Sequence, residues 1–144
     1  MKHLVTFYFL IFVFSQNLYA HGFDEDETRY KGPIPKKAYI ISPQDGANVP
    51  QTFKVIFGLK GMKISPAGIE QANSGHHHLL VDAKELPDMG KPLGKSLMHF
   101  GKGQTETTLT LTPGSHTLQL IMGDYMHMPH KPAVVSKKIT VVVE

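Results

Sequence analysis

The sequence predicts an all-β protein, with its main domain an antiparallel immunoglobulin-like β-sandwich of about seven strands. Short stretches of apolar residues, several of them alternating with polar ones, are separated by Pro- and Gly-rich turns along most of the chain. No segment has a convincing 3.6-residue apolar period, and prolines interrupt every candidate helix. Because the chain has no Cys and no Trp, it lacks the Cys–Trp–Cys core of antibody domains and is expected to be a relative of that fold at most.

Alternation and turn residues define the predicted strands. In 105–112, Leu109 and Leu111 share one face and threonines occupy the other, and Pro113-Gly114 then turns the chain into the alternating segment 115–122. Between the strands we expect a turn at 43–50 and long loops at 61–75, 83–96 and 123–132. The predicted strands are 38–42, 52–59, 76–82, 97–100, 105–112, 115–122 and 133–144.

The first twenty residues are typical of a secretory signal peptide. Lys2 gives a positive start, Leu4 to Phe14 is almost entirely apolar, and Ala20 is a small residue suited to precede the cut. The apolar stretch is too short to span about 30 Å of hydrocarbon as a stable helix, although a membrane-anchoring helix that is never cleaved is the alternative. We therefore expect a periplasmic or secreted protein with no stable membrane insertion after cleavage.

The length of the chain and its composition indicate its domain organisation. At 144 residues the chain has room for one domain, which we place at 38–144 after the signal peptide (1–20) and a flexible N-terminal tail (21–37).

Loss of Lys2 would lower the formal charge from +3 to +2, and the lysines are scattered, so no nucleic-acid surface is expected. The absence of Cys excludes disulfides, thiolate metal sites and a cysteine nucleophile.

Histidine is the residue type that carries a functional signal. Nine histidines are present, and convergent neutral imidazoles are common ligands of Zn, Cu and Ni. His76 and His78 share one face of a predicted strand, whereas His127 and His130 are three residues apart in a loop. The expected ligand pool is His76, His78, His99, His127 and His130. The alternative is that these side chains are structural and hydrogen-bond to backbone groups.

Methionine points to copper. Met126 and Met128 flank His127 in a polar loop, and a thioether suits Cu(I) while imidazole suits Cu(II). We therefore include both methionines in the predicted site, with copper as the first metal and zinc as the second. Met98 and Met122 are better explained as core residues. If cleavage follows Ala20, His21 could add an N-terminal copper chelate.

No catalytic machinery is predicted. The segment 90–96 (GKPLGKS) resembles a phosphate-binding loop, but it has three residues where the motif needs four and no helix is predicted after it. Ser115, His116 and Asp124 lack the nucleophile elbow of a hydrolase triad. We expect that the protein is not an enzyme.

Several segments resemble the DUF4399 family of small exported bacterial domains. The resemblance covers about residues 38–144, and it is carried most distinctively by GHHHLL (75–80) and HFGKGQTET (99–107). It implies a compact, exported, β-rich domain with histidines at seven positions and no settled activity. The matching histidines are His76, His77, His78, His99, His116, His127 and His130. Met126 and Met128 are not part of the resemblance.

Together these features predict an exported metal-binding module that stores, delivers or protects against copper. Its candidate partners are a metal ion and an envelope protein. The alternative is a non-catalytic interaction or ligand-binding domain in which the histidine cluster is structural. The two hypotheses differ in geometry, since metal ligands must converge within about 2.0–2.1 Å of one ion.

Overall fold

The computed structural model describes residues 32–144, and this part of the chain contains strands and no helix. The predicted signal peptide and His21 lie outside the described residues, as does the tail up to residue 31. Residues 32–36 have no regular structure and lead into β1. Within 32–144, no helix is long and apolar enough to cross a membrane.

Nine strands occur in the described residues, and each of the seven predicted segments overlaps one of them. The predicted last strand, 133–144, is shorter in the structure, because only its second half forms a regular strand, while Val135 in the first half makes an isolated bridge to Ile121. The strands are β1 (Lys37–Ser42), β2 (Ala47–Val49), β3 (Thr52–Lys60), β4 (Lys63–Ile64), β5 (Ser74–Val81), β6 (Met98–His99), β7 (Glu106–Thr110), β8 (Gly114–Gly123) and β9 (Ile139–Val143).

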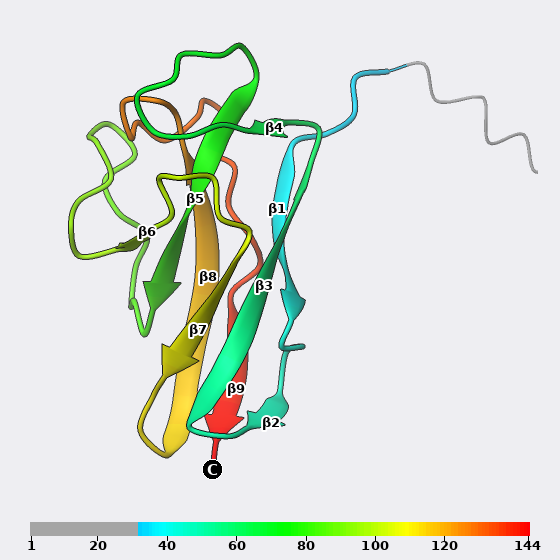
Figure 1. Cartoon of the computed structure of the whole chain (residues 1–144), viewed down its shortest axis with the longest axis vertical. Helices are drawn as coiled ribbons and strands as arrows, with labels where there is room; N and C mark the ends of the chain where they lie inside the picture. Colours follow the sequence, from blue (N-terminus) through cyan, green and yellow to red (C-terminus); the bar gives the residue numbers. More distant parts are fainter. Residues whose placement is uncertain (1–31) are drawn as a thin grey trace, which may run out of the picture. The chain divides into compact units, whose positions relative to one another are not determined.

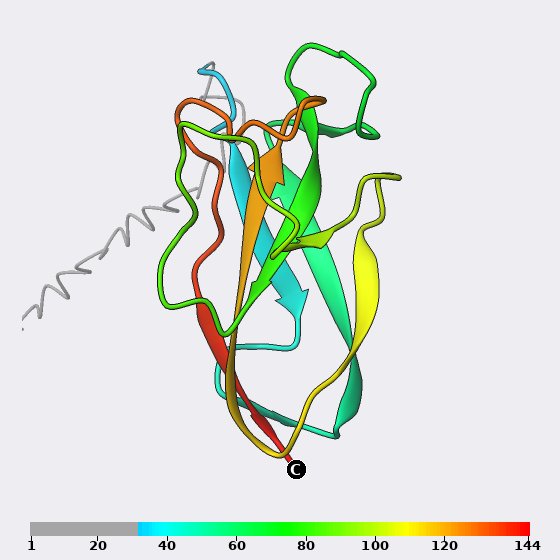
Figure 2. The ribbon, with the colours of Figure 1, turned by 90° about the vertical axis from the view of Figure 1, so that its left-hand side faces the viewer.

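Two sheets form a β-sandwich, which confirms the all-β class (Figures 1 and 2). One sheet has the order β1-β3-β7, and the other has the order β2-β9-β8-β5-β4 with β6 also paired to β5. The expectation of a purely antiparallel fold is wrong at two places, because β2 pairs with β9 and β4 pairs with β5 in parallel. Both added strands are short and lie within segments that the Pro and Gly content had assigned to turns and loops.

The main core lies between the two sheets. Phe53, Val55 and Phe57 alternate along β3 with more exposed residues, and they pack with inward-facing residues of β8 such as Leu118 and Leu120. Side chains on a strand alternate between its two faces, so the apolar residues at alternate positions of β3 and β8 are the ones predicted to face the core. Of the two methionines expected in the core, Met122 is fully buried there, whereas the expectation is wrong for Met98, which is 39% exposed on the edge strand β6.

Strand β5 is buried on both faces, which is the feature that positions the site. Its inner face contributes Leu79 to the main core. Its outer face contributes Leu80 to a second apolar cluster with Leu93 and Ile121, beneath the loop 83–97. By alternation, His76 and His78 share the outer face with Leu80, whereas His77 points inward and packs against Phe57 with ring centroids 5.2 Å apart.

Candidate metal site

His76 and His78 form the fixed half of the site. Both are fully buried on β5, and their ring centroids are 4.8 Å apart. On the neighbouring strand β8, Gly123 pairs with His76. A Cβ atom on Gly123 would lie only 2.9 Å from His78 Cε1, so a glycine at this position leaves the room that the imidazole needs.

His99 reaches the same site from the other side of β5. It lies on β6 directly opposite His78, and their rings stack with centroids 5.0 Å apart. A Cβ atom on Gly101 would overlap the ring of His99, so the missing side chain at Gly101 defines where that ring can lie. His99 is exposed, in contrast to the two histidines of β5.

His127 comes from the loop that follows β8, and its backbone is unusual. Its φ of 66° lies in the left-handed region that non-glycine residues seldom occupy. Asp124 holds the turn, because its Oδ1 accepts hydrogen bonds from the backbone N–H groups of Met126 and Met128, each at 2.8 Å. The N–H of His127 donates to the carbonyl of Asp124, and the carbonyl of His127 accepts from the N–H of Leu93.

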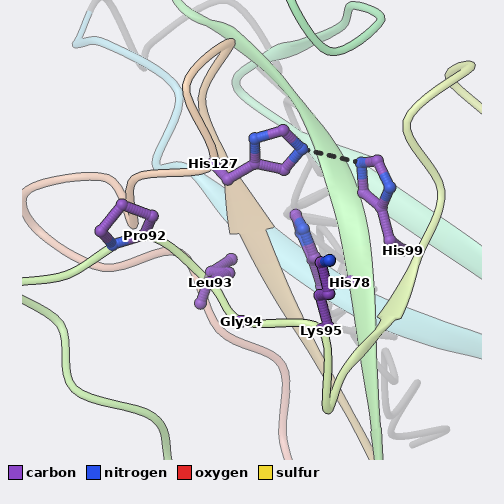
Figure 3. Close-up of a pocket in the computed structure, with 7 residues that line it drawn as sticks. All are labelled: His78, Pro92, Leu93, Gly94, Lys95, His99 and His127. Carbon is purple, nitrogen blue, oxygen red and sulfur yellow. Dashed lines mark hydrogen bonds between the residues drawn. The ribbon is translucent and has the colours of Figure 1, made fainter.

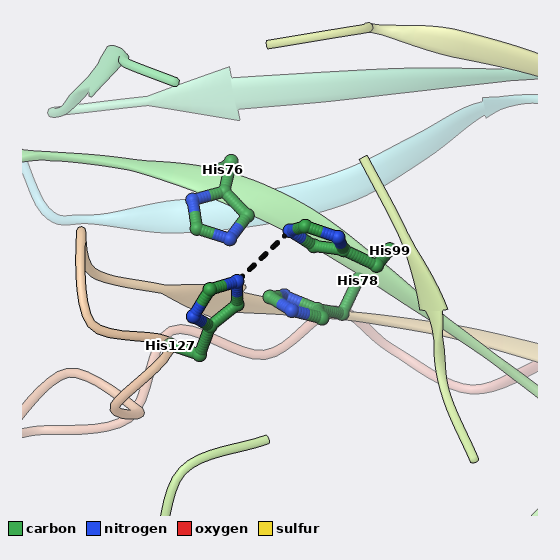
Figure 4. Close-up of side chains that lie close together, drawn as sticks. All are labelled: His76, His78, His99 and His127. Atoms are coloured by element: carbon green, nitrogen blue, oxygen red, sulfur yellow. Dashed lines mark hydrogen bonds between the residues drawn. The ribbon is translucent and has the colours of Figure 1, made fainter. Parts of the chain in front are cut away.

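These elements bring four imidazoles together (Figure 4). One nitrogen from each of His76, His78, His99 and His127 can be chosen so that all four atoms lie within 4.8 Å of one another. The Nε2 atoms of His99 and His127 are 3.1 Å apart. Nitrogens bound at 2.0–2.1 Å to one tetrahedral ion are separated by about 3.3 Å, so the His99–His127 pair is already near this spacing, and the most distant pair would have to approach by up to about 1.5 Å.

The two buried imidazoles of this four-histidine cluster lack hydrogen bonds. Neither nitrogen of His76 or His78 has a partner among the described residues. Burial, followed by the nearby imidazoles, lowers the pKa of His76 to about 4 and that of His78 to about 3, with the His76 backbone opposing the shift at His78 slightly. Burial and His127 also lower the pKa of His99. At neutral pH these three rings are therefore uncharged and carry a free lone pair, which is the form that binds a metal.

An open pocket of about 300 Å³ lies next to the four-histidine cluster (Figure 3). Three of the four imidazoles, those of His78, His99 and His127, line it. The opposite wall is the segment Pro92–Lys95, which the hydrogen bond from Leu93 to the His127 loop holds in place. No sequence pattern predicts this wall, because a Pro- and Gly-rich loop has no periodicity that indicates what it covers.

Comparison with known proteins identifies the family. A family model described as "Domain of unknown function (DUF4399)" matches residues 55–144. The chain belongs to the DUF4399 family. The match includes all four histidines of the cluster, and it confirms the resemblance seen in the sequence.

Two solved structures show similarity to this DUF4399 chain. The endo-β-1,4-mannanase from Thermotoga petrophila is 16% identical with a TM-score of 0.45, over 76% of this chain and 20% of its own, so the chain spans about a fifth of the mannanase. The fibronectin(III)-like modules of Clostridium thermocellum CbhA are 14% identical with a TM-score of 0.39, over 74% and 95% respectively. Curated protein sequences give no match.

The structure places His130 of the DUF4399 domain away from the four-histidine cluster. A Cβ atom on Gly75 would lie 2.9 Å from His130 Nε2. Because Gly75 and His76 are adjacent on β5, their side-chain directions are opposite, and His130 therefore lies on the other face of the strand. Its Nε2 is buried without a hydrogen-bond partner, and burial lowers its pKa.

The two methionines predicted as ligands also lie apart from the pocket. Met126 is 58% exposed and Met128 is partly buried, and neither is among the residues that line the pocket beside the four-histidine cluster. The hydrogen bonds of their backbone N–H groups to Asp124 explain why the loop presents His127 to the site. The methionines contribute backbone to the turn.

His116 shows what a structural histidine looks like in the same domain. Its Nδ1 is 2.7 Å from Asp82 Oδ2, and its Nε2 is 2.8 Å from the Thr112 carbonyl. Both nitrogens therefore have acceptors, and hydrogen bonding to Asp82 raises the pKa of His116. The two partnered nitrogens of His116 contrast with the unpartnered nitrogens of His76 and His78.

Proposed function

We propose that this DUF4399 protein is an exported, periplasmic metal-binding module whose ligands are the four-histidine cluster. We propose copper as the metal of this site, with zinc as the second choice. The observation that carries the proposal is the convergence of four imidazoles, two of them buried with no hydrogen-bond partner. The protein acts as a binding module rather than an enzyme, in storage, delivery or protection, with an envelope protein as the source or recipient of the ion.

The energetic argument starts from the buried nitrogens. A buried polar group with no partner costs about 1–3 kcal/mol, and His76 and His78 together have four such nitrogens. A bound ion would satisfy one nitrogen of each ring. Because the imidazoles of His76, His78 and His99 are already neutral at pH 7, the ion would displace few protons when it binds.

The ligand set favours Cu(II) over Zn(II). Nitrogen ligands follow an affinity order in which Cu(II) exceeds its first-row neighbours, including Zn(II). The thioether argument for Cu(I) is weaker than the sequence suggested, because Met126 and Met128 do not line the pocket at the site. Copper is therefore proposed on the four imidazoles alone.

The alternative function, a ligand-binding or interaction domain with a structural histidine cluster, requires that the imidazoles brace the fold by hydrogen bonds. His116 does this with Asp82 and Thr112. His76 and His78 have no such bonds among the described residues, but neither does His77, which points away from the cluster, so it is the convergence of the four imidazoles that favours the metal hypothesis.

The deciding experiment is a titration of the tag-free protein with Cu(II), Cu(I) and Zn(II), followed by metal analysis. We expect one tightly bound ion per chain. His127→Ala should weaken binding by at least tenfold, whereas His130→Ala, in the same loop but on the other face of β5, should leave affinity nearly unchanged. Absence of stoichiometric binding, or equal losses in the two variants, would refute the proposal.

A further inference from the structure

The pocket beside the four-histidine cluster is much larger than an ion requires. Its volume is about 300 Å³, whereas one water molecule occupies about 30 Å³ in the liquid. His78, His99 and His127 present their rings to this space, so an ion held by them would have one side facing the pocket. Four imidazoles complete a tetrahedral sphere, so a ligand from the pocket would be a fifth one on the side that faces it, an expansion that four-coordinate metal sites can undergo.

The charge of the site favours an anion at that position. None of the four ligands is a carboxylate, so they leave the +2 charge of a bound dication uncompensated, and only Asp124, which acts on His76 from outside the ligand set, offsets part of it. The residues that line the pocket include no Asp or Glu, and the single charged side chain among them is Lys95. Buried Leu93 forms part of the same wall, and a low-dielectric wall strengthens the attraction between an ion and an anion.

We propose that a small monoanion enters this pocket and binds directly to the metal, with the ammonium of Lys95 supplying a second positive charge. This inference rests on the proposed function, because it needs an ion in the four-histidine cluster. It assigns to the segment Pro92–Lys95 a role as the outer wall of an anion site. The site would thus hold its ion as a complex with an external ligand.

Azide is a suitable probe, because it gives a charge-transfer absorption band when it binds directly to Cu(II). The full chain loaded with one Cu(II) would be titrated with azide at constant ionic strength. We expect a saturable band. Lys95→Ala should raise the azide dissociation constant by about two- to fivefold, the range for one exposed charge pair. Lys60→Ala removes the same charge from β3, outside the pocket lining, and should leave the constant unchanged.

The outcomes separate the two proposals. If no metal binds, the proposed function fails and this inference fails with it. If Cu(II) binds but azide produces no band, the coordination sphere is closed and only the inference is overturned. A band with equal constants in Lys95→Ala and Lys60→Ala would overturn the role of Lys95. If the chain binds only Zn(II), Co(II) replaces it, and a change in the Co(II) visible spectrum with azide is the corresponding readout.

Discussion

The Nε2 atoms of His99 and His127 lie 3.1 Å apart, although the two residues are 28 positions apart in the chain. A hydrogen bond between these two nitrogens uses the lone pair of one of them. An ion placed between the rings would use both lone pairs at nearly the same separation. The relationship between these two side chains is therefore already close to that of two ligands on one ion.

The first prediction concerns Gly101, which leaves room for the ring of His99. Gly101→Ala should displace that ring and weaken metal binding by about tenfold or more, the range seen when groups that orient a ligand are changed. Gly90→Ala is the control, because Gly90 does not line the pocket and its Cβ atom would meet only Asp88 Oδ1, at 3.3 Å. Competition titration with a chelator measures both. Equal affinities in the two variants would show that the ring position of His99 does not matter.

The second prediction concerns Asp124, which holds the turn that carries His127. Asp124→Ala removes the acceptor of two backbone hydrogen bonds, so the left-handed conformation of His127 should become less populated in the metal-free protein. We expect the metal affinity of Asp124→Ala to be about tenfold lower. Asp124→Asn should retain most of the affinity, because its amide oxygen can accept the same hydrogen bonds. The readout is again chelator competition. Retained affinity in Asp124→Ala would contradict the positioning role.

The third prediction is that the metal-free protein loses stability in mild acid. The pKa of His78 is about 3 in the folded protein against 6.5 for an ordinary histidine. Below pH 6.5 the unfolded chain therefore binds protons that the folded chain does not, and stability falls as the pH is lowered. At pH 5 one such residue costs up to about 2 kcal/mol. Urea unfolding at pH 7 and pH 5 measures the difference, and His78→Gln should reduce it.

The fourth prediction concerns His116, whose pKa is shifted upward, so that its contribution to stability decreases as the pH rises. Hydrogen bonding to Asp82 raises its pKa, so the stability that it contributes is fully present below pH 6.5 and is lost as the pH rises through the folded value. Both nitrogens face acceptors, which requires the doubly protonated ring. NMR titration should give a pKa above 6.5 that returns toward 6.5 in Asp82→Asn. A normal pKa in the unmodified protein would exclude this charged pair.

Strand patterns made most of the fold predictable. Alternation located β7 and β8, and the absence of any 3.6-residue period correctly predicted no helix in the described residues. The short parallel strand β2 was missed because Pro43 and Pro50 surround it and the segment matches a turn. Parallel pairing depends on which distant strand lies alongside, and local residue type does not encode this.

The candidate site was predictable in part. Alternation alone placed His76 and His78 on one face, and their convergence is what the structure shows. His99 and His127 could be proposed only by residue type, since their approach depends on β6 pairing with β5 and on a loop. Sequence spacing could not separate His127 from His130. The left-handed backbone of His127 is what distinguishes it from His130. This conformation depends on hydrogen bonds to Asp124 that no local sequence pattern predicts.

The unequal anchoring of the four ligands has a kinetic consequence. His76 and His78 lie on a strand that is buried on both faces, whereas His99 is exposed on the two-residue strand β6 and His127 lies in a loop that backbone hydrogen bonds join to Leu93 and Gly68. Local opening of peripheral segments costs less free energy than global unfolding. The lifetime of a bound ion would then depend on how often the His99 and His127 segments open locally. A recipient protein could take up the ion during such an opening, without unfolding of the sandwich.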